Sequence, residues 1–292
     1  MEHKCGYVAI LGRPNVGKST LLNALLNFKL SIVTPKPQTT RNKILGILNG
    51  DDYQIIFIDT PGILKPQYTL QRLMQKEITS AVSTADLFLI VVEPFSPPTE
   101  DEINLIKKVS SFPMILAINK IDCVDKPSIL PIIDAYQKFP FREIHPISAL
   151  NQDGIEDLKK SIVDNLPYAE PFYPKDQLSE KPERFFIAEL IRETIFTNYG
   201  EEIPYSTIVE IEEVKEREVG KTYIRATIYV QKSTQRAIIL GKDGSAIKKL
   251  GSNARKKIEQ FLNKPVYLEL LVKVKEDWRD NESFIKNILY KI

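Results

Sequence analysis

Gly12-Arg13-Pro14-Asn15-Val16-Gly17-Lys18-Ser19 lies between an apolar run, residues 6–11, and a stretch with helical spacing, residues 19–26. The octapeptide fits the G-x-x-x-x-G-K-[S/T] pattern, whose glycines let successive backbone N–H groups turn toward phosphate oxygens. The start of the following helix adds the positive end of its dipole. The pattern therefore predicts a phosphate-binding loop, in which Lys18 neutralises the β and γ oxygens of a nucleotide and Ser19 binds magnesium.

Apolar runs alternate with amphipathic stretches throughout the first half of the chain. Strands are expected at residues 6–11, 43–49, 54–59, 85–93, 114–119 and 143–148. Helical spacing of apolar residues appears at 19–26, 70–82, 99–110, 130–138 and 155–166. Repeated βαβ units place helices over a mostly parallel sheet, so residues 1–166 are predicted to form an α/β nucleotide-binding domain.

The pattern changes in the second half. Residues 167–182 hold four prolines, which remove backbone donors and oppose regular structure, so this stretch is expected to be a linker. Beyond it come a helix, two strands, two helices and a strand, expected at 183–197, 205–215, 222–231, 234–240, 245–262 and 266–275. This order predicts a separate α+β domain, residues 183–292.

The overall charge argues against a uniformly basic nucleic-acid coat protein, because Lys and Arg number 40 and Asp and Glu number 38. The charge is uneven within the second domain. Residues 221–264 carry eleven Lys or Arg against two acids, whereas residues 183–218 carry ten acids against four bases. The first of these stretches is expected to attract polyanions.

Composition also bounds the class of protein. The apolar runs are far shorter than the roughly 18 residues of a membrane span, and no apolar secretory segment follows Met1. With 43% apolar residues the chain can bury sizeable cores, so a soluble, cytoplasmic protein is expected. Cys5 and Cys123 have no spacing typical of a disulfide framework or a zinc site.

Two further motifs follow apolar runs, at the edge where α/β sheets bind ligands. Asp59 begins Asp59-Thr60-Pro61-Gly62 and can reach a magnesium ion, while the Gly62 N–H approaches the γ-phosphate. The tetrad Asn119-Lys120-Ile121-Asp122 ends with an aspartate that can accept hydrogen bonds from guanine N1–H and the exocyclic amine. The tetrad therefore predicts selection of guanine. Ser148-Ala149 is a weaker signal, for a backbone N–H that donates to the base oxygen.

The loop Pro35-Lys36-Pro37-Gln38-Thr39-Thr40-Arg41 can supply a threonine hydroxyl to magnesium when a γ-phosphate holds the loop in place. Thr40 is favoured over Thr39, although little in the sequence separates them. The residue after Gly62 is Ile63, which cannot orient an attacking water, so slow intrinsic hydrolysis is expected. The predicted catalytic groups are Lys18, Thr40 and Gly62.

Gly241-Lys242-Asp243-Gly244 lies between two expected helices of the second domain. A Gly-x-x-Gly loop in this element order is the K-homology (KH) arrangement, in which the loop lets a nucleic-acid backbone pass closely and a neighbouring groove takes unstacked bases. Because phosphate contacts supply affinity, binding should weaken with salt. The expected RNA contacts are Ile239, Gly241, Lys242, Asp243, Gly244, Ile247, Lys248, Lys249 and Arg255.

Over nearly its whole length the chain resembles the Era family of bacterial GTPases. The resemblance rests on residues 12–20, 37–41, 59–62, 119–122, 148–150, 241–255 and 272–281. It implies a P-loop GTPase domain with a mostly parallel sheet, followed by a type II KH domain, and a magnesium-dependent GTPase. Its GTP-bound form would grip single-stranded RNA near the 3′ end of 16S ribosomal RNA, beside the anti-Shine–Dalgarno sequence, during assembly of the 30S subunit.

The motifs and the resemblance together give the site residues. Magnesium would be held by Ser19, Thr40 and Asp59. Asn15 matches an asparagine that helps to hold a potassium ion in related potassium-activated GTPases, and the family also implies a hydrophobic residue at Ile63. GTP or GDP would be bound by Gly12, Asn15, Val16, Gly17, Lys18, Ser19, Thr20, Asp59, Gly62, Asn119, Lys120, Asp122, Ser148 and Ala149.

Two other functions stay open at this point. One is a constitutive RNA-binding protein whose nucleotide domain is only a structural platform. The other is a regulatory GTPase at the membrane surface, whose basic patch adsorbs to anionic lipid. Peripheral association with the inner face of the cell membrane is therefore kept as an alternative to a purely cytoplasmic location, and a monomer is expected in either case.

Overall fold

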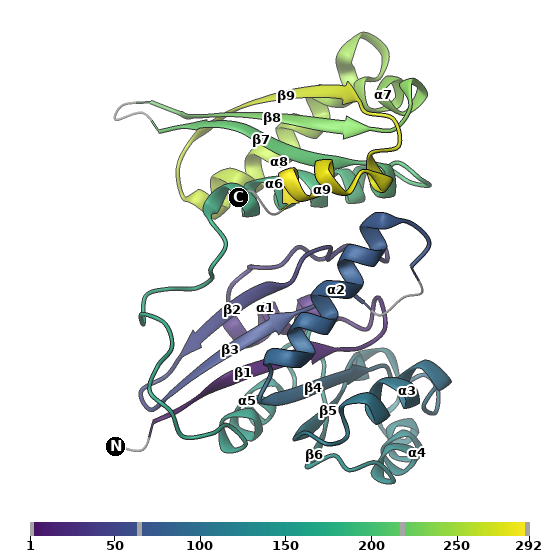
Figure 1. Cartoon of the computed structure of the whole chain (residues 1–292), viewed down its shortest axis with the longest axis vertical. Coiled ribbons are helices and arrows are strands. Elements are labelled where there is room, and N and C mark those ends of the chain that lie inside the picture. Colours follow the sequence, from purple (N-terminus) through teal and green to yellow (C-terminus); the bar gives the residue numbers. More distant parts are fainter. Residues whose placement is uncertain (1–2, 63–65, 217–219, 290–292) are drawn as a thin grey trace. The chain divides into compact units, whose positions relative to one another are not determined.

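The computed structural model describes residues 3–62, 66–216 and 220–289, so Ile63 lies outside the described residues. The chain divides into two compact units (Figure 1). The first comprises residues 1–66 and 71–180, and the second comprises residues 67–70 and 181–292. The boundaries expected from the sequence, after residues 166 and 182, stay predictions.

The first unit is built on a six-stranded sheet with the strand order β2-β3-β1-β4-β5-β6. β2 runs antiparallel to β3, and the other neighbouring pairs are parallel, which confirms the predicted mostly parallel sheet. The strands are β1 (Lys4–Leu11), β2 (Ile44–Asn49), β3 (Tyr53–Asp59), β4 (Leu87–Val92), β5 (Met114–Ile118) and β6 (Glu143–Pro146).

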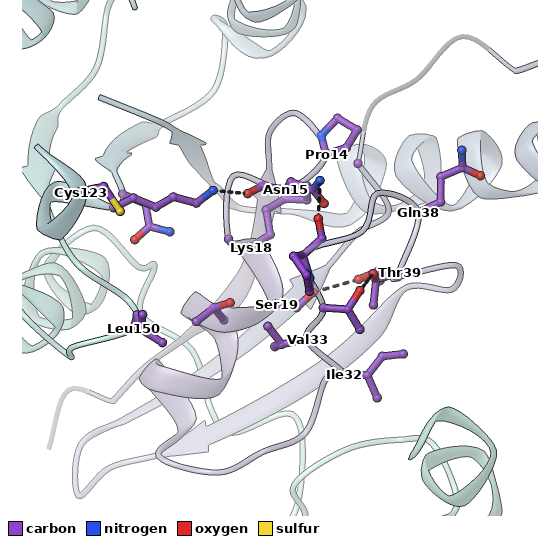
Figure 2. A pocket seen from close by; sticks show the side chains of 18 of the residues that line it. Pro14, Asn15, Lys18, Ser19, Ile32, Val33, Gln38, Thr39, Cys123 and Leu150 are labelled. Atoms are coloured by element: carbon purple, nitrogen blue, oxygen red, sulfur yellow. Dashed lines mark hydrogen bonds between the residues drawn. The ribbon is translucent and has the colours of Figure 1, made fainter. Parts of the chain in front are cut away.

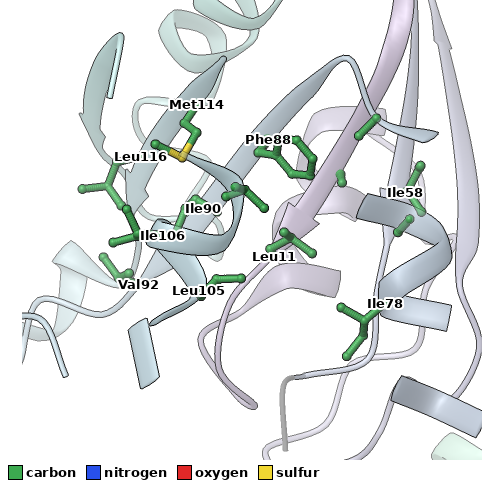
Figure 3. Packing of buried hydrophobic residues seen from close by; sticks show 14 of the residues in the cluster. Leu11, Ile58, Ile78, Phe88, Ile90, Val92, Leu105, Ile106, Met114 and Leu116 are labelled. Atoms are coloured by element: carbon green, nitrogen blue, oxygen red, sulfur yellow. The ribbon is translucent and has the colours of Figure 1, made fainter. Parts of the chain in front are cut away.

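Helices cover both faces of this sheet. The helices are α1 (Lys18–Leu26), α2 (Thr69–Thr84), α3 (Glu100–Val109), α4 (Lys126–Gln137) and α5 (Ile155–Asp164), with a 3₁₀ turn η1 (Ile121–Cys123). Ile78 of α2 and Leu105 of α3 pack with Leu11 and Phe88 of the strands in one core (Figure 3). α1 and α5 contact each other and cover the opposite face, toward which the alternate strand residues point.

Local sequence explains where two of the helices begin. Thr99 and Glu102 form a capping box at α3, because the Thr99 N–H donates to the Glu102 carboxylate at 2.8 Å and the Thr99 hydroxyl accepts from the Glu102 N–H at 3.4 Å. α4 begins at Lys126, four residues before the expected start at 130. Pro127 fits its first turn, because an N–H there would have no partner within the helix.

The proline-rich stretch after α5 is bound to the first unit as far as residue 180. The fully buried side chain of Gln54 accepts hydrogen bonds from the N–H groups of Phe172 and Tyr173, at 2.8 and 2.9 Å, and donates to the Tyr173 carbonyl at 2.8 Å. Farther along, the Ile47 N–H donates to the Leu178 carbonyl at 2.9 Å. Most of the stretch expected to be a linker thus lies along the strands.

The second unit holds a three-stranded sheet with the order β7-β8-β9, in which β7 and β8 are antiparallel and β8 and β9 are parallel. The buried sides of α6 and α8 pack on it through a core that includes Ile191, Ile228 and Ile258. The predicted αββααβ order is confirmed. Its elements are α6 (Glu183–Asn198), η2 (Pro204–Ser206), β7 (Ile208–Lys215), β8 (Thr222–Val230), α7 (Ser233–Leu240), η3 (Lys242–Gly244), α8 (Ser245–Leu262), β9 (Val266–Val274), η4 (Trp278–Asp280) and α9 (Glu282–Leu289).

Within the described part of the chain, the helices all fall short of the length and apolar character that crossing a bilayer requires.

Candidate functional site

A cavity of about 540 Å³ opens in the first unit where β1, β3 and β5 end (Figure 2). The phosphate loop, the loop before β2 and the residues after β5 supply most of its lining, and Gly62 after β3 and Leu150 after β6 complete it. Gly17 has φ +96°, and a Cβ built there would lie 2.3 Å from the Asn119 side-chain nitrogen. Only glycine fits this position, so the second glycine of the phosphate-loop pattern has a steric reason.

Lys18 is almost completely buried at the start of α1. Its ammonium group donates to the carbonyls of Gly12 and Arg13, at 3.1 and 2.8 Å. Burial lowers the pKa of Lys18 to about 8, although the nearby Asp59 carboxylate partly opposes this shift. The cation is thus held inside the loop, where phosphate oxygens of a nucleotide would lie.

Ser19, Thr40 and Asp59 meet beside this lysine. The Ser19 hydroxyl donates to Asp59 Oδ2 at 2.7 Å and lies 2.9 Å from Thr40 Oγ1. Asp59 is fully buried, and its Oδ1 has no hydrogen-bond partner among the described residues. Burial raises the pKa of Asp59, although the hydrogen bond from Ser19 and the charge of Lys18 oppose the rise. An unpartnered buried carboxylate oxygen beside two hydroxyls is a donor set that suits Mg²⁺.

The two adjacent threonines have different surroundings. Thr39 Oγ1 donates to the Lys36 carbonyl at 2.7 Å and lies 2.6 Å from Thr34 Oγ1. It therefore makes contacts within its own loop, whereas Thr40 faces Ser19.

Gly62 lines the same cavity, and a Cβ there would lie 2.7 Å from Pro14 Cα, so the chain after β3 passes directly against the phosphate loop.

The tetrad after β5 links the base end of the cavity to the phosphate loop. The Asn119 side chain donates to the Val16 carbonyl at 2.8 Å and accepts from the Ala149 N–H at 2.9 Å. Lys120 donates to the Asn15 carbonyl at 2.7 Å and pairs with the Glu93 carboxylate. Asn119 and Lys120 therefore join the phosphate loop, which lies 103 and 105 positions away in the sequence, to Glu93 and Ala149, which lie 27 and 30 positions away.

Asp122 is the exposed carboxylate at this end. The Ser148 hydroxyl donates to its Oδ1 at 2.5 Å, and this bond lowers the pKa of Asp122. Ser148 thus keeps the aspartate ionised and oriented as a hydrogen-bond acceptor. Sequence reasoning assigned the Ser148-Ala149 pair only a backbone donor, so the side-chain role was missed.

Sequence reasoning also missed cavity residues that carry no motif. Ile32, Val33, Cys123 and Leu150 line the cavity together with the motif residues. Glu93, the partner of Lys120, directly follows β4. Its position at the carboxyl end of a strand could have marked it as a candidate site residue. The predicted nucleotide-binding residues that line the cavity are Asn15, Gly17, Lys18, Ser19, Thr20, Gly62, Asn119, Lys120 and Asp122, and the predicted magnesium ligand Thr40 lines it as well.

The second unit carries the Gly-x-x-Gly loop between α7 and α8. Gly241 and Gly244 have φ +69° and +72°, and a Cβ on Gly241 would lie 2.6 Å from the Ala246 Cβ. Lys242, Lys248 and Lys249 are exposed. The backbone conformation therefore requires glycine at the first position and leaves the loop surface open.

A groove of about 340 Å³ runs between α8 and β9 in this unit. Its lining residues are Ile247, Lys248, Gly251, Ser252, Arg255, Tyr267, Leu268 and Leu270. Three of the predicted RNA contacts, Ile247, Lys248 and Arg255, are among them.

The predicted RNA contact Ile239 does not reach the surface, because its side chain has no exposed area and packs in the core. Its neighbour Ile238 is 50% exposed, so helical phase places 238 rather than 239 at the surface.

The pocket of the first unit and the Gly-x-x-Gly module that follows it in the chain define a class of protein, a P-loop GTPase with a carboxy-terminal KH domain. Family models agree with both halves. Residues 7–120 match the model described as 50S ribosome-binding GTPase, and residues 202–279 match the KH domain model.

Curated relatives and solved structures extend the match to the whole chain. GTPase Era of Ruminiclostridium cellulolyticum is 43% identical, with 100% of this chain and 99% of the relative covered. A chloroplastic ERA-like GTPase of Oryza sativa is 47% identical, with 99% and 70% covered. A variant of Aquifex aeolicus Era bound to GDP·AlF4⁻ is 39% identical, with a TM-score of 0.94 and 98% of each chain covered. The chain belongs to the Era family of GTPases.

A second solved Era structure, in complex with MgGDPNP and nucleotides 1506–1542 of 16S ribosomal RNA, has the same identity, coverage and TM-score. The predicted fold, family and GTPase activity are thereby confirmed.

Proposed function

We propose that this GTPase binds GTP together with Mg²⁺ and, in that state, grips single-stranded RNA at the 3′ end of 16S ribosomal RNA to assist assembly of the 30S subunit. The observation that carries the proposal is the meeting of Thr40 with Ser19 and Asp59. Thr40 belongs to a loop of the cavity rim, so a ligand that requires its hydroxyl also requires that loop to be closed. The RNA-bound Era structure supports the choice of RNA.

In this proposal three groups of residues bind the magnesium ion, the phosphates and the base. Ser19, Thr40 and Asp59 hold Mg²⁺, which supplies charge neutralisation to the β- and γ-phosphates when bound. Lys18 and the loop N–H groups hold the phosphates. Asp122, oriented by Ser148, accepts from the guanine ring, while the Ala149 N–H, which was expected to face the base oxygen, donates to the Asn119 side chain. Gly12, Val16, Gly17 and Thr20 complete the phosphate loop, and Lys120 covers it from the base side.

For hydrolysis, the chain contributes electrostatic stabilisation and positioning. Lys18 places a buried cation where negative charge develops on the transferred group. The Gly62 N–H donates to the γ-phosphate, and Thr40 closes the loop over it, which excludes bulk water. With no side chain assigned to orient the attacking water, we expect intrinsic turnover to be slow.

Asn15 is the residue proposed to help hold K⁺. It has φ +66°, and its side-chain nitrogen donates to the Pro35 carbonyl at 3.0 Å. Its amide therefore lies between the phosphate loop and the loop that carries Thr40, a place where a monovalent cation can neutralise phosphate charge. The K⁺ role of Asn15 is tested by measuring the rate of GTP hydrolysis in matched concentrations of KCl and NaCl. An equal rate in both salts would rule this role out.

The proposed RNA contacts are the Gly241–Gly244 loop with Lys242 and Asp243, the lysines Lys248 and Lys249, and the groove residues Ile247 and Arg255. We propose that the protein is a monomer in the cytoplasm.

The nucleotide dependence of RNA binding is tested by fluorescence anisotropy of an RNA of the 16S 3′ region, measured with GDPNP, with GDP and without nucleotide. We expect the tightest binding with GDPNP. Equal affinity in all three states would leave only a constitutive RNA-binding protein.

Anionic vesicles separate RNA binding from adsorption to a membrane. The same protein is offered vesicles and RNA, with Gly241 and Gly244 each replaced by aspartate. Loss of RNA binding is expected, because an acidic side chain at either position repels phosphate, and a side chain on Gly241 would also clash with Ala246. Undiminished RNA binding by both variants, together with vesicle adsorption that resists RNA competition, would support the membrane-surface function instead.

A further inference from the structure

The groove between α8 and β9 extends well beyond the Gly-x-x-Gly loop. α8 begins directly after the loop at Ser245 and ends at Leu262, and β9 starts at Val266. The Val266 N–H donates to the Glu259 side chain at 2.9 Å, so the start of β9 lies beside the last part of α8. Tyr267, which lines the groove, therefore stands at its end away from the loop.

The ring of Tyr267 is exposed yet held in place. It is 57% exposed and stacks on Tyr223, with ring centroids 6.0 Å apart and 14° between the planes. The two tyrosines face each other in the parallel register of β8 and β9. Tyr223 is in turn fixed, because its hydroxyl donates to Glu269 at 2.5 Å. A stacked and anchored ring loses little further rotamer freedom on binding a ligand.

The sheet order decides which face of the Tyr267 ring is available. β9 is the edge strand, and Tyr223 belongs to β8, its only strand neighbour within the described residues. Tyr223 therefore covers the ring face that points into the sheet. Tyr267 alternates along β9 with Leu268 and Leu270, which pack toward α8, so its ring stands on the other side of the strand and its second face is turned toward the open edge of the sheet, beside the groove.

The groove suits a ligand that alternates negative charge with flat rings. Lys248 and Arg255 supply cations along α8, and Leu268 and Leu270 supply apolar surface along β9. Single-stranded RNA has this alternation of phosphates and bases, whereas a lipid surface has no flat ring for Tyr267.

We infer that Tyr267, backed by Tyr223, is a stacking platform for a nucleobase at the end of the RNA groove opposite the Gly-x-x-Gly loop. This inference rests on the proposed binding of RNA in that groove. Base–aromatic stacking tolerates different bases, so Tyr267 lengthens the stretch of RNA that is bound without selecting one base. It adds one nucleotide-binding position to those at the loop.

The test uses the full-length protein with GDPNP and RNAs of the 16S 3′ region, shortened one nucleotide at a time. We expect Tyr267→Ala to weaken binding of the longest RNA by roughly 5- to 100-fold. Tyr267→Phe should retain affinity within about twofold, and Tyr267→Leu, which keeps apolar area without a ring, should behave as alanine. Tyr168→Ala, at a 65% exposed tyrosine of the first unit, is the matched control and should have no effect.

RNA length identifies the contact. Below a certain length the RNA no longer reaches Tyr267, so wild type and Tyr267→Ala should bind it equally. An abasic nucleotide at the position facing Tyr267 should weaken wild-type binding by the same factor and add nothing to Tyr267→Ala. Equal affinity of wild type and Tyr267→Ala for every RNA, or full rescue by leucine, would overturn the inference. Failure of the wild-type protein to bind any of the RNAs would instead overturn the proposed function.

Discussion

Thr40 and Thr39 offer a sharp test of the nucleotide switch, because they are neighbours with the same side chain. We predict that Thr40→Val lowers the preference for GDPNP over GDP in Mg²⁺ by about 10- to 100-fold, whereas Thr39→Val changes it by less than about threefold. Removal of a residue that only hydrogen-bonds to a metal ligand typically lowers metal affinity about 10- to 100-fold, so loss of a hydroxyl that itself binds Mg²⁺ should cost at least as much. Only the nucleotide with a γ-phosphate requires the loop that carries Thr40 to be closed.

The structure indicates that the substitution itself leaves the fold intact. Valine has the shape of threonine, and Ser19 keeps its 2.7 Å hydrogen bond to Asp59 when the Thr40 hydroxyl is lost. The expected cost in the free energy of unfolding is about 1 kcal/mol or less. Thr39→Val removes two contacts, to Lys36 and Thr34, so it should destabilise its loop at least as much.

Calorimetry with GDPNP and GDP, in Mg²⁺ and in EDTA, measures the effect, and urea unfolding measures stability. In EDTA the Thr40→Val and wild-type proteins should converge. If Thr39→Val reduced the preference for GDPNP and Thr40→Val did not, the assignment of the magnesium ligand would be wrong. If neither did, neither hydroxyl would sense the γ-phosphate.

Three further outcomes are expected. Asp122→Asn should move the preference from guanine to xanthine nucleotides by at least about 100-fold in a competition assay, because the carboxylate pairs with the donors of guanine; unaltered selectivity would contradict this role. Nucleotide affinity should fall above pH 8, by up to about tenfold per pH unit, because Lys18 has a pKa of about 8 in the free pocket and phosphate raises it in the complex. Calorimetry in buffers of different ionisation enthalpy should therefore detect proton uptake at pH 8.5 and little at pH 6.5. Gln54→Ala should lower the free energy of unfolding by about 1–3 kcal/mol and speed proteolysis within residues 167–180, since it removes the partner of the part-buried N–H groups of Phe172 and Tyr173; equal cleavage rates would show that this stretch is held by other contacts.

Local pattern was enough to predict most of the elements and many of the residues that line the cavity of the first unit. The P-loop, Asp59 and the tetrad at Asn119 each combine a strand end with residue types that have few other uses, so their positions could be read one at a time. The start of α4 was harder to predict, because Pro127 and Pro131 interrupt its helical spacing. Pro127 is nevertheless compatible with the first turn of the helix.

Side-chain direction was harder to predict than element type. Ile238 and Ile239 are equally apolar, and which of them enters the core depends on the rotation of α7 against the sheet of the second unit. Ser148 and Asp122 lie 26 positions apart, and no local signal pairs their side chains.

By itself the amino-acid order determined the family, the guanine-type chemistry and the presence of an RNA-binding module, since each depends on short motifs whose residues act within a few positions of one another. Which threonine faces Ser19, which face of Tyr267 is open, and how Gln54 binds the stretch after α5 were decided only by the tertiary structure. These features join residues that are distant in the chain, or depend on the rotation of a backbone, and such relations arise only when strands and helices have packed.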